Sequence, residues 1–306
     1  QFYDDYNGRQ AAHEQKMSII KDMDLVYDLK MADKENEIHT TTGLENAGRS
    51  MYNSMTPEEK AAWDAHYDPI IQKFKKDKLS GKQLSEWKYQ QYMRDYLRVI
   101  HSIDRNIGVL LNYLEKTGLL ENTMIVYTSD QGFYMGEHGW FDKRFMYEES
   151  FRTPLLIMYP KMIKAGSVCN ELVQNIDYAP TYLALAGVKS PVKMDGRSLI
   201  PLFSGEKPET GVKASIIIIM IIQLFTWFAA TMVFPMPLQT DSFYGKGEAK
   251  DAGADAEYFE LYDLQNDPHE MKNVVNVPSY KEHVERLKSE LVKYQKDLKI
   301  REGNIE

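Results

Sequence analysis

Two oxygen-bearing side chains stand next to each other at the end of a short apolar run. Residues 123–128 read TMIVYT, which is typical of a buried strand, and Asp130, Gln131 and Gly132 follow it. Ligand sites of α/β sheets lie at the carboxyl ends of strands. A carboxylate beside a carboxamide offers oxygen donors that suit Ca²⁺ or Mg²⁺. Gly132 permits a sharp turn, although the tripeptide alone also fits an ordinary capped turn.

A loop with cationic side chains follows at residues 136–144. It holds His138, Lys143 and Arg144, and no apolar period runs through it. A site for a sulfate or phosphate ester needs a metal ion that polarises one oxygen and fixed cations that hold the others. Lys143 offers a point charge and Arg144 a planar fork. The alternative interpretation of these two residues is a solvated charge pair.

The composition is that of a globular protein and narrows the function only in part. The 306 residues are 43% hydrophobic and 27% charged, with a formal net charge of −8. This charge argues against nonspecific nucleic-acid binding, but it does not exclude an anionic substrate, because local charge decides that. Cys169 is the only cysteine, which excludes an internal disulfide. Residues 1–20 contain no apolar run, so we expect no signal peptide within this sequence.

The remaining patterns predict an α/β sandwich with a parallel or mixed sheet between helices. The composition shifts after Gly205, so we expect residues 1–205 to belong to one domain and residues 206–306 to form a small α+β subdomain. Periodicity and capping residues predict a short helix at 19–29, a helix that starts at Thr56 with Pro57 and Glu59, a long amphipathic helix at 85–116 ended by Gly118, strands at 123–128 and 153–159, a helix at 175–186, a strand at 258–264 and a terminal helix at 279–299.

Two blocks of residues resemble the sulfatases of the alkaline phosphatase superfamily, in the family's order. The resemblance implies an alkaline phosphatase-like sandwich, of which this chain carries an incomplete central mixed sheet flanked by helices. The first block comprises Asp104, Gly108, Leu111, Leu114, Gly118, Asn122, Thr123, residues 128–132, Gly136, His138, Gly139, Lys143, Pro154 and Leu155, and the second comprises residues 260–264, Asp267, Pro268, Glu270 and Asn273.

The resemblance implies a role for each candidate residue. Asp130 and Gln131 match the second pair of ligands of a Ca²⁺ ion, and Mg²⁺ is the less expected metal. Lys143 matches a catalytic lysine that contacts the sulfate ester near its leaving oxygen. His138 and Arg144 are candidate substrate contacts in the same loop. The implied function is hydrolysis of sulfate esters of small molecules or glycans, commonly sulfated carbohydrates, by a periplasmic or secreted enzyme.

The sequence departs from the family pattern at the nucleophile. The family uses a formylglycine made from cysteine in a Cys-x-Pro-x-Arg segment, and Cys169 has neither that proline nor that arginine. The family's first Asp-Asp metal pair and a sulfate-contacting histidine also have no match here. We therefore expect the C-terminal portion of a sulfatase. The alternatives are a phosphodiesterase or phosphotransferase of the same superfamily, a non-catalytic remnant, and a membrane-associated protein.

The apolar, uncharged segment at 214–237 does not fit this pattern. It is long enough to span a membrane, but it lies between an α/β body and the last strand of that body, which argues against a membrane partner. We hypothesise that residues 216–242 are translated out of frame. A one-base shift turns Met220-Ile221 into aspartate and permits tyrosine at each Ile-Ile junction, so the nucleotide sequence decides. On this hypothesis the segment does not pack as a native strand.

Because the nucleophile segment is missing, we expect these 306 residues on their own to hydrolyse no sulfate ester. The measurement is chromophore release from an aryl sulfate by the purified chain, with a complete sulfatase as the positive control. Turnover by the chain alone would contradict this expectation.

Overall fold

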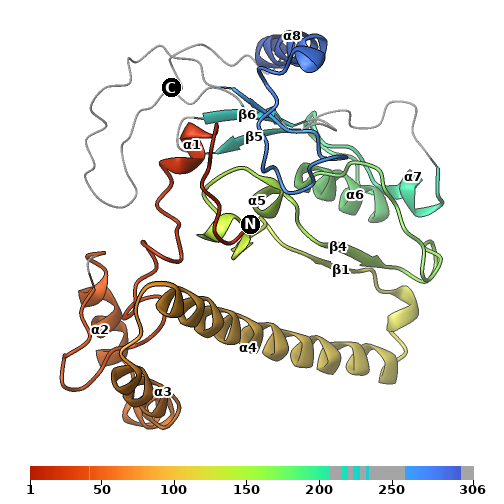
Figure 1. The fold of residues 1–306 in the computed structure, drawn as a ribbon. Helices are drawn as coiled ribbons and strands as arrows, with labels where there is room; N and C mark the ends of the chain where they lie inside the picture. The colour runs from red at the N-terminus through yellow and green to blue at the C-terminus, as the bar shows by residue number, and fades with distance from the viewer. Residues whose placement is uncertain (41, 207–214, 220–222, 228–231, 234–258, 298–306) are drawn as a thin grey trace.

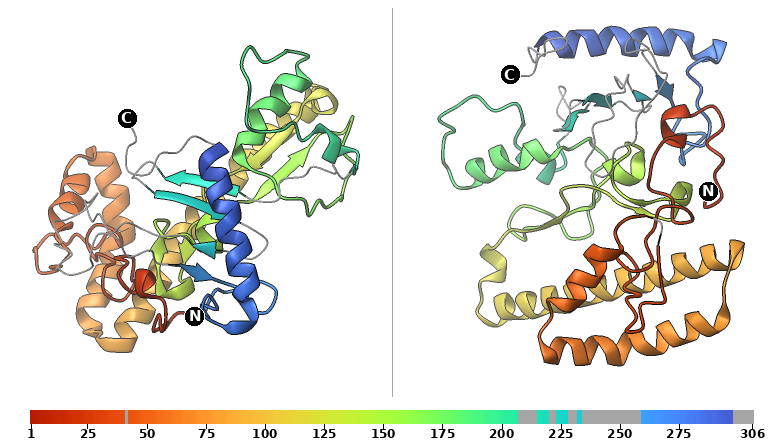
Figure 2. Two further views of the ribbon diagram at one scale, coloured as in Figure 1. Left: turned by 90° about the horizontal axis from the view of Figure 1, so that it is seen from above. Right: turned by 90° about the vertical axis from the view of Figure 1, so that its left-hand side faces the viewer.

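The structure is a computed structural model that describes residues 1–40, 42–206, 215–219, 223–227, 232–233 and 259–297. Its largest element is α4 (Gly81–Lys116), which runs along one side of the molecule beside α3 (Pro57–Asp77) (Figure 1). A central pair of strands lies between α4 and α6 (Tyr178–Leu185), as two further views show (Figure 2). Helices on both sides of a strand layer confirm the predicted α/β class.

Local signals determine where the two long helices begin and end. The Thr56 hydroxyl accepts a hydrogen bond from Glu59 N at 3.2 Å, and the Glu59 carboxylate accepts one from Thr56 N at 2.8 Å. These two bonds form the predicted capping box. α4 begins at Gly81, one turn earlier than predicted, with Ser80 at its N-cap. Gly118 follows its end with a φ of +70°, as expected for a glycine that ends a helix.

The N-terminal segment forms turns rather than the predicted helix at 19–29. The Asp24 carboxylate accepts hydrogen bonds from Val26 N and Tyr27 N, both at 2.7 Å, and these local bonds compete with helical ones. The short helices of this segment are α1 (Gln10–His13) and α2 (Glu45–Asn53). The apolar residues that suggested a helix are nevertheless buried against α3, in a cluster of Ile19, Met23, Val26, Leu29, Met31, Ile38, Tyr67 and Ile71.

The central strands are β1 (Ile125–Thr128), which follows η1 (Leu120–Asn122), and β4 (Leu155–Met158). They pair antiparallel, with Thr128 opposite Leu155. The strand pairs among the described residues are antiparallel, as the predicted mixed sheet permits. The connection from β1 to β4 lacks the long crossover helix that usually joins a parallel pair. That connection consists of β2 (Tyr134–Met135), η2 (Glu137–Gly139), β3 (Phe141–Asp142) and α5 (Glu148–Phe151).

The C-terminal part packs on a small core of its own. Leu261, Val274 and Leu287 are its buried residues. The predicted helices at 175–186 and 279–299 are confirmed within a few residues, and the predicted strand at 258–264 is shorter than expected. The elements are η3 (Asn175–Asp177), which continues into α6, then α7 (Ile200–Phe203), β8 (Glu260–Leu261), η4 (Pro278–Tyr280) and α8 (Lys281–Asp297).

Parts of the apolar segment at 214–237 form strands. β5 (Ser215–Ile219) pairs antiparallel with β6 (Gln223–Trp227), and β7 (Met232–Val233) pairs with β8. The backbone of these residues is extended, and the prediction that the segment does not pack as a native strand stays a prediction. The reading frame stays a hypothesis, and the rest of 207–258 lies outside the described residues. Of the helices that the structure describes, none has the length and apolar character needed to cross a bilayer.

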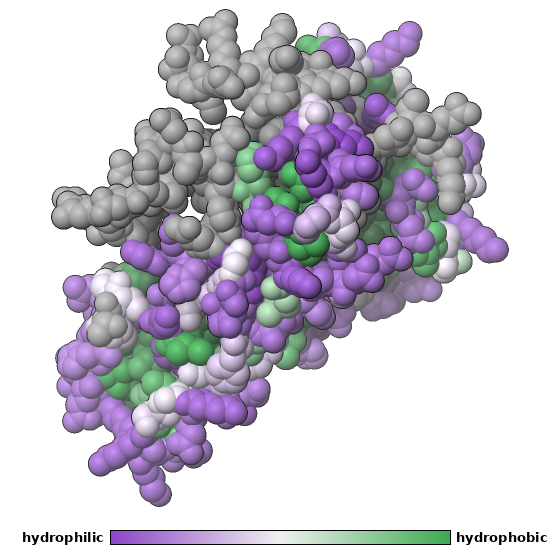
Figure 3. All heavy atoms as spheres, turned by 45° about the horizontal axis from the view of Figure 1, so that its top comes forward, coloured by the Kyte–Doolittle hydropathy of each residue, from purple (hydrophilic) through white to green (hydrophobic). Residues whose placement is uncertain are grey.

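The apolar face predicted on α4 is packed against the protein at Tyr92 and Tyr96 and exposed to solvent farther along. Near its start, the Tyr96 ring stacks on Phe133 with centroids 5.7 Å apart, and the Tyr92 hydroxyl donates to Tyr134 O at 3.0 Å. Farther along, Val99 is 60% exposed. Figure 3 shows that apolar patches also occur among the polar side chains on one face of the molecule. The first part of α4 therefore supports the loop after β1, and the second part presents an apolar surface.

Candidate functional site

Asp130 and Gln131 lie directly after β1, where the sequence predicts a cation site. Asp130 is exposed and Gln131 is half-buried. The Ser129 hydroxyl lies 3.4 Å from an Asp130 carboxylate oxygen, a long contact that leaves the carboxylate accessible. The hydroxyls of Thr128 and Tyr178 are 3.1 Å apart, and this contact connects the end of β1 to α6. Two oxygen donors are thus presented at a strand end whose backbone is held.

Gly132 brings the turn after Gln131 into close contact with α5. Gly132 N donates a hydrogen bond to Ser150 O at 2.8 Å. A Cβ atom at residue 132 would lie 2.0 Å from Glu149 O, so only glycine fits this approach. The sequence explained Gly132 by backbone freedom, and the structure shows that the missing side chain is the stronger requirement.

Lys143 and Arg144 follow β3 and are both exposed. Arg144 forms an ion pair with Asp142 at 2.8 Å, so part of its guanidinium already has a partner. Among the described residues, no carboxylate pairs with the Lys143 ammonium. The backbone of Lys143 is held, because the Ser150 hydroxyl donates to Lys143 O at 2.7 Å. Ser150 thus contacts both the Gln131–Gly132 turn and the Lys143 loop.

His138 lies in the interior, whereas the resemblance made it a candidate substrate contact. Its side chain is fully buried, and Nδ1 lies 2.8 Å from an Asp4 carboxylate oxygen. The Tyr6 hydroxyl donates to His138 O at 2.6 Å, and the Tyr147 ring lies 4.8 Å from the imidazole. These contacts support a role in fixing the loop. Direct contact with substrate stays a prediction for His138.

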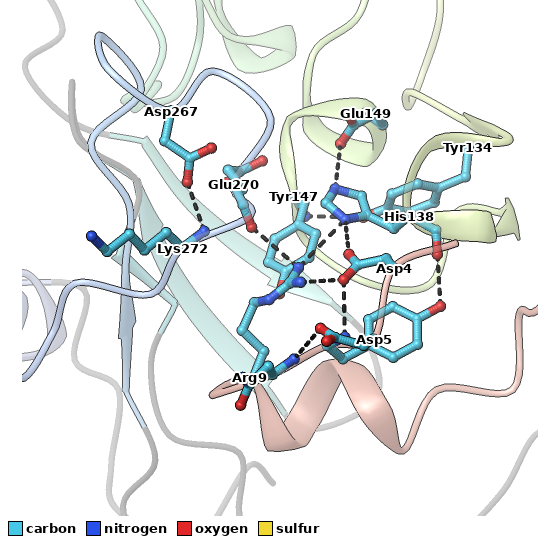
Figure 4. A network of polar contacts seen from close by, with 12 residues as sticks. Asp4, Asp5, Arg9, Tyr134, His138, Tyr147, Glu149, Asp267, Glu270 and Lys272 are labelled. Carbon is cyan, nitrogen blue, oxygen red and sulfur yellow. Dashed lines mark hydrogen bonds and ion pairs between the residues drawn. The ribbon is translucent and has the colours of Figure 1, made fainter. Parts of the chain in front are cut away.

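A buried polar network surrounds His138 and joins three distant parts of the chain (Figure 4). Arg9 forms an ion pair with Asp4 and donates to Glu270 O at 3.2 Å. Burial raises the pKa of Asp4, but hydrogen bonds from His138 and Arg9 outweigh it and lower the pKa to about 2. Glu149 on α5 lies 3.7 Å from His138 Nε2. The network connects the N-terminal segment, the loop at 136–144 and the tail.

Sequence reasoning did not find the partners in this network. Glu270 belongs to the tail block of the family resemblance, but nothing in its position shows that its carboxylate accepts a hydrogen bond from Glu148 N at 2.7 Å. Asp4 and Arg9 lie in a polar segment with no periodicity, and their partner His138 is more than a hundred residues away. Contacts of this separation leave no pattern in a single sequence.

Asp130 and Gln131 fit a hard divalent cation as part of a larger ligand set. Both side chains offer oxygen, and neither is buried behind apolar atoms. Calcium takes about six to eight oxygen ligands. Among the described residues, no group of three or more histidine, cysteine, aspartate or glutamate side chains could hold a metal ion. The described residues thus bring together two oxygen donors at this strand end.

The class of protein follows from the fold together with the exposed Asp130 carboxylate and Lys143 ammonium groups. Helices cover a strand layer (Figure 2), and oxygen-bearing side chains follow a strand end whose turn is connected through Ser150 to the backbone of the exposed Lys143. The sulfatase family model matches residues 25–188, and the model of the C-terminal region of N-sulphoglucosamine sulphohydrolase matches residues 136–297. The chain belongs to the sulfatase family.

Individual relatives support this assignment. An N-acetylglucosamine-6-O-sulfatase of Bacteroides thetaiotaomicron is 43% identical over 97% of this chain and 52% of its own length. A solved structure of a complex with its substrate D-glucosamine-2-N,6-O-disulfate superposes with a TM-score of 0.82 at 39% identity, over 98% of this chain and 59% of that one. A phosphonate monoester hydrolase from Silicibacter pomeroyi has a TM-score of 0.55 at 25% identity, over 72% of this chain and 43% of that one.

Gly132→Ala should lower the free energy of unfolding by about 1–3 kcal/mol, because the new Cβ atom displaces the turn from α5. Denaturant unfolding measures this change. Gly108→Ala is the matched control, since no atom outside its own helix lies within 4 Å of the added Cβ. The control should be neutral or slightly stabilising. Equal losses for both variants would contradict the role given to Gly132.

Stability should also depend on the Glu148 carboxyl, because burial raises its pKa from 4.5 to about 7. A pKa raised by folding contributes stability below the unfolded value, and this contribution is lost as the pH rises through about 7. Glu148→Gln should therefore be more stable than the parent at pH 8, by roughly 1 kcal/mol after solvent screening, and should unfold at a higher temperature. The difference should vanish near pH 4.5.

Thermal unfolding followed across this pH range checks the effect. Glu121→Gln replaces an exposed glutamate and should leave the pH profile unchanged. A Glu148→Gln profile parallel to that of the parent would show that burial of this carboxyl does not govern the pH dependence.

Proposed function

We propose that the protein to which this chain belongs hydrolyses sulfate esters of carbohydrates, with 6-O-sulfated glucosamine as the substrate class. The observation that carries the proposal is the strand end at Asp130 and Gln131, joined through Ser150 to the exposed Lys143. The high identity to an N-acetylglucosamine-6-O-sulfatase supports the substrate class. The chain spans about half the length of that relative, so the activity is proposed for the whole protein.

Asp130 and Gln131 would hold the divalent cation through a carboxylate and a carboxamide oxygen. Sulfatases generally bind a divalent metal, and we infer calcium here because a neutral carboxamide oxygen suits its larger, more flexible ligand shell. The bound cation supplies positive charge that polarises the sulfate oxygens. The remaining ligands and the nucleophile would come from the part of the protein that this chain does not contain.

Lys143 is the proposed catalytic residue of this chain. Its exposed ammonium would stabilise the negative charge that develops on the leaving oxygen when the ester bond breaks. Arg144 would bind a sulfate oxygen with the side of its guanidinium that Asp142 does not occupy. His138 would act indirectly, because its contact with Asp4 would hold the loop at 136–144 in place.

The relatives also bear on the location of the enzyme and on the alternative function. Relatives include an extracellular sulfatase homolog from Drosophila melanogaster, 44% identical over 36% of this chain, which supports a periplasmic or secreted enzyme. The phosphonate monoester hydrolase neighbour supports the alternative of a phosphoester hydrolase. Gln131 favours the sulfatase with its expected Ca²⁺ over a Zn²⁺-dependent phosphoester hydrolase, because nitrogen, sulfur and carboxylate ligands are typical of Zn²⁺.

The test uses an enzyme in which residues 1–306 are joined to the part of the Bacteroides relative that they do not match. This joined enzyme should release sulfate from glucosamine 6-sulfate, and Lys143→Ala should lower kcat/KM by about 10²–10³-fold, as for loss of one charge-stabilising donor. Asp130→Asn should weaken calcium binding, measured by titration calorimetry. Lys164→Ala, at another exposed lysine, is the control and should keep the parent rate.

Two results would contradict the proposal. One is faster hydrolysis of a phosphonate monoester or phosphodiester than of the sulfate ester. The other is full activity of Lys143→Ala while Lys164→Ala is equally active, because the ammonium at 143 would then have no part in the reaction.

A further inference from the structure

Ser150 contacts both halves of the candidate site through different atoms. Its carbonyl oxygen accepts the hydrogen bond from Gly132 N at 2.8 Å, next to the metal ligand Gln131. Its hydroxyl donates to Lys143 O at 2.7 Å. The backbone of the cation-binding turn and the backbone of the catalytic lysine are therefore connected through one residue.

Ser150 is itself held firmly. It is 8% exposed, and its N–H donates to Tyr147 O at 2.9 Å. Tyr147 is fully buried in the aromatic core, and Glu148 N donates to a carboxylate oxygen of Glu270 in the tail. A residue with this many fixed neighbours can transmit the position of the core to the groups that it contacts.

The Lys143 backbone needs such a support. Asp142, which precedes it, has a φ of +76°, in the left-handed region that costs a residue with a side chain about 1 kcal/mol or more. Such a conformation persists only where neighbouring contacts hold it. The Lys143 side chain is exposed and flexible, so the position of its backbone limits where its ammonium can reach.

We propose that Ser150 is a positioning residue that holds Lys143 at a set place relative to the cation ligands Asp130 and Gln131. It acts through Lys143 and does not touch the substrate. This inference rests on the proposed function, because it assigns the effect of Ser150 to the lysine of that site. The two bonds of Ser150 also separate cleanly: Ser150→Ala removes the hydroxyl bond to Lys143 and keeps the carbonyl bond to Gly132.

A double-mutant cycle in the joined enzyme tests the proposal with glucosamine 6-sulfate as substrate. Ser150→Ala should lower kcat by roughly five- to tenfold, the usual effect of losing one neutral hydrogen bond, and leave the calcium dissociation constant within about twofold. In the Lys143→Ala background, Ser150→Ala should have no further effect, since the group that it positions is gone. Ser150→Thr keeps the hydroxyl and should recover most of the rate.

Ser167→Ala is the matched control, because the Ser167 hydroxyl also donates to a lysine carbonyl, Lys164 O, at 2.7 Å but on an exposed turn. It should leave kcat unchanged. Ser150→Cys has a similar size and only a weak donor. It provides a second series with the same expected coupling should Ser150→Ala fail to fold, which circular dichroism would show.

The outcomes separate this proposal from the proposed function. Additive losses in Ser150→Ala and Lys143→Ala would overturn the positioning role while the catalytic lysine stands. Full activity of Ser150→Ala beside an inactive Lys143→Ala would overturn it as well. Full activity of Lys143→Ala would contradict the catalytic role of Lys143 in the proposed function. It would also contradict the positioning role of Ser150, which acts through Lys143.

Discussion

The buried contact between Asp4 and His138 is the constraint on which the rest of the site depends. Polar and charged groups removed from water are costly unless they are hydrogen-bonded or paired, and the two side chains are 1% and 0% exposed. Loss of Asp4 would remove a partner that the buried side chains of His138 and Arg9 share. The start of the chain and the loop at 136–144 must therefore keep their relative positions, and Arg9 extends this requirement to the tail through Glu270 O.

The loop at 136–144 has a buried side and an exposed side. Trp140 stacks between Tyr6 and Tyr147, with centroid distances of 5.2 and 5.8 Å, while Lys143 a few residues later faces solvent. The backbone at Lys143 is thus held by the hydrogen bond from Ser150, on a loop whose other side packs in the aromatic core. A held backbone restricts the region that the flexible lysine side chain can reach.

The sequence predicted the elements with strong local signals and missed those set by distant contacts. The capping box at Thr56, the glycine after α4 and the strand before Asp130 follow from neighbouring residues, and the structure has all three. The antiparallel pairing of β1 with β4 and the burial of His138 depend on partners far along the chain. The turns at 19–29 arise instead from local bonds to the Asp24 carboxylate, which the apolar periodicity does not reveal. The site residues came from the resemblance. The structure places Asp130 and Lys143 at the surface, and their roles stay predictions.

The close approach at Gly132 has a consequence for how such a protein can diversify. Because Glu149 O leaves no room for a side chain, and because Ser150 contacts the turn and the lysine loop together, insertions or larger residues in either segment disturb both. Changes in length or side-chain size are then tolerated more readily on surfaces outside this junction, because the two segments of the junction can change only together.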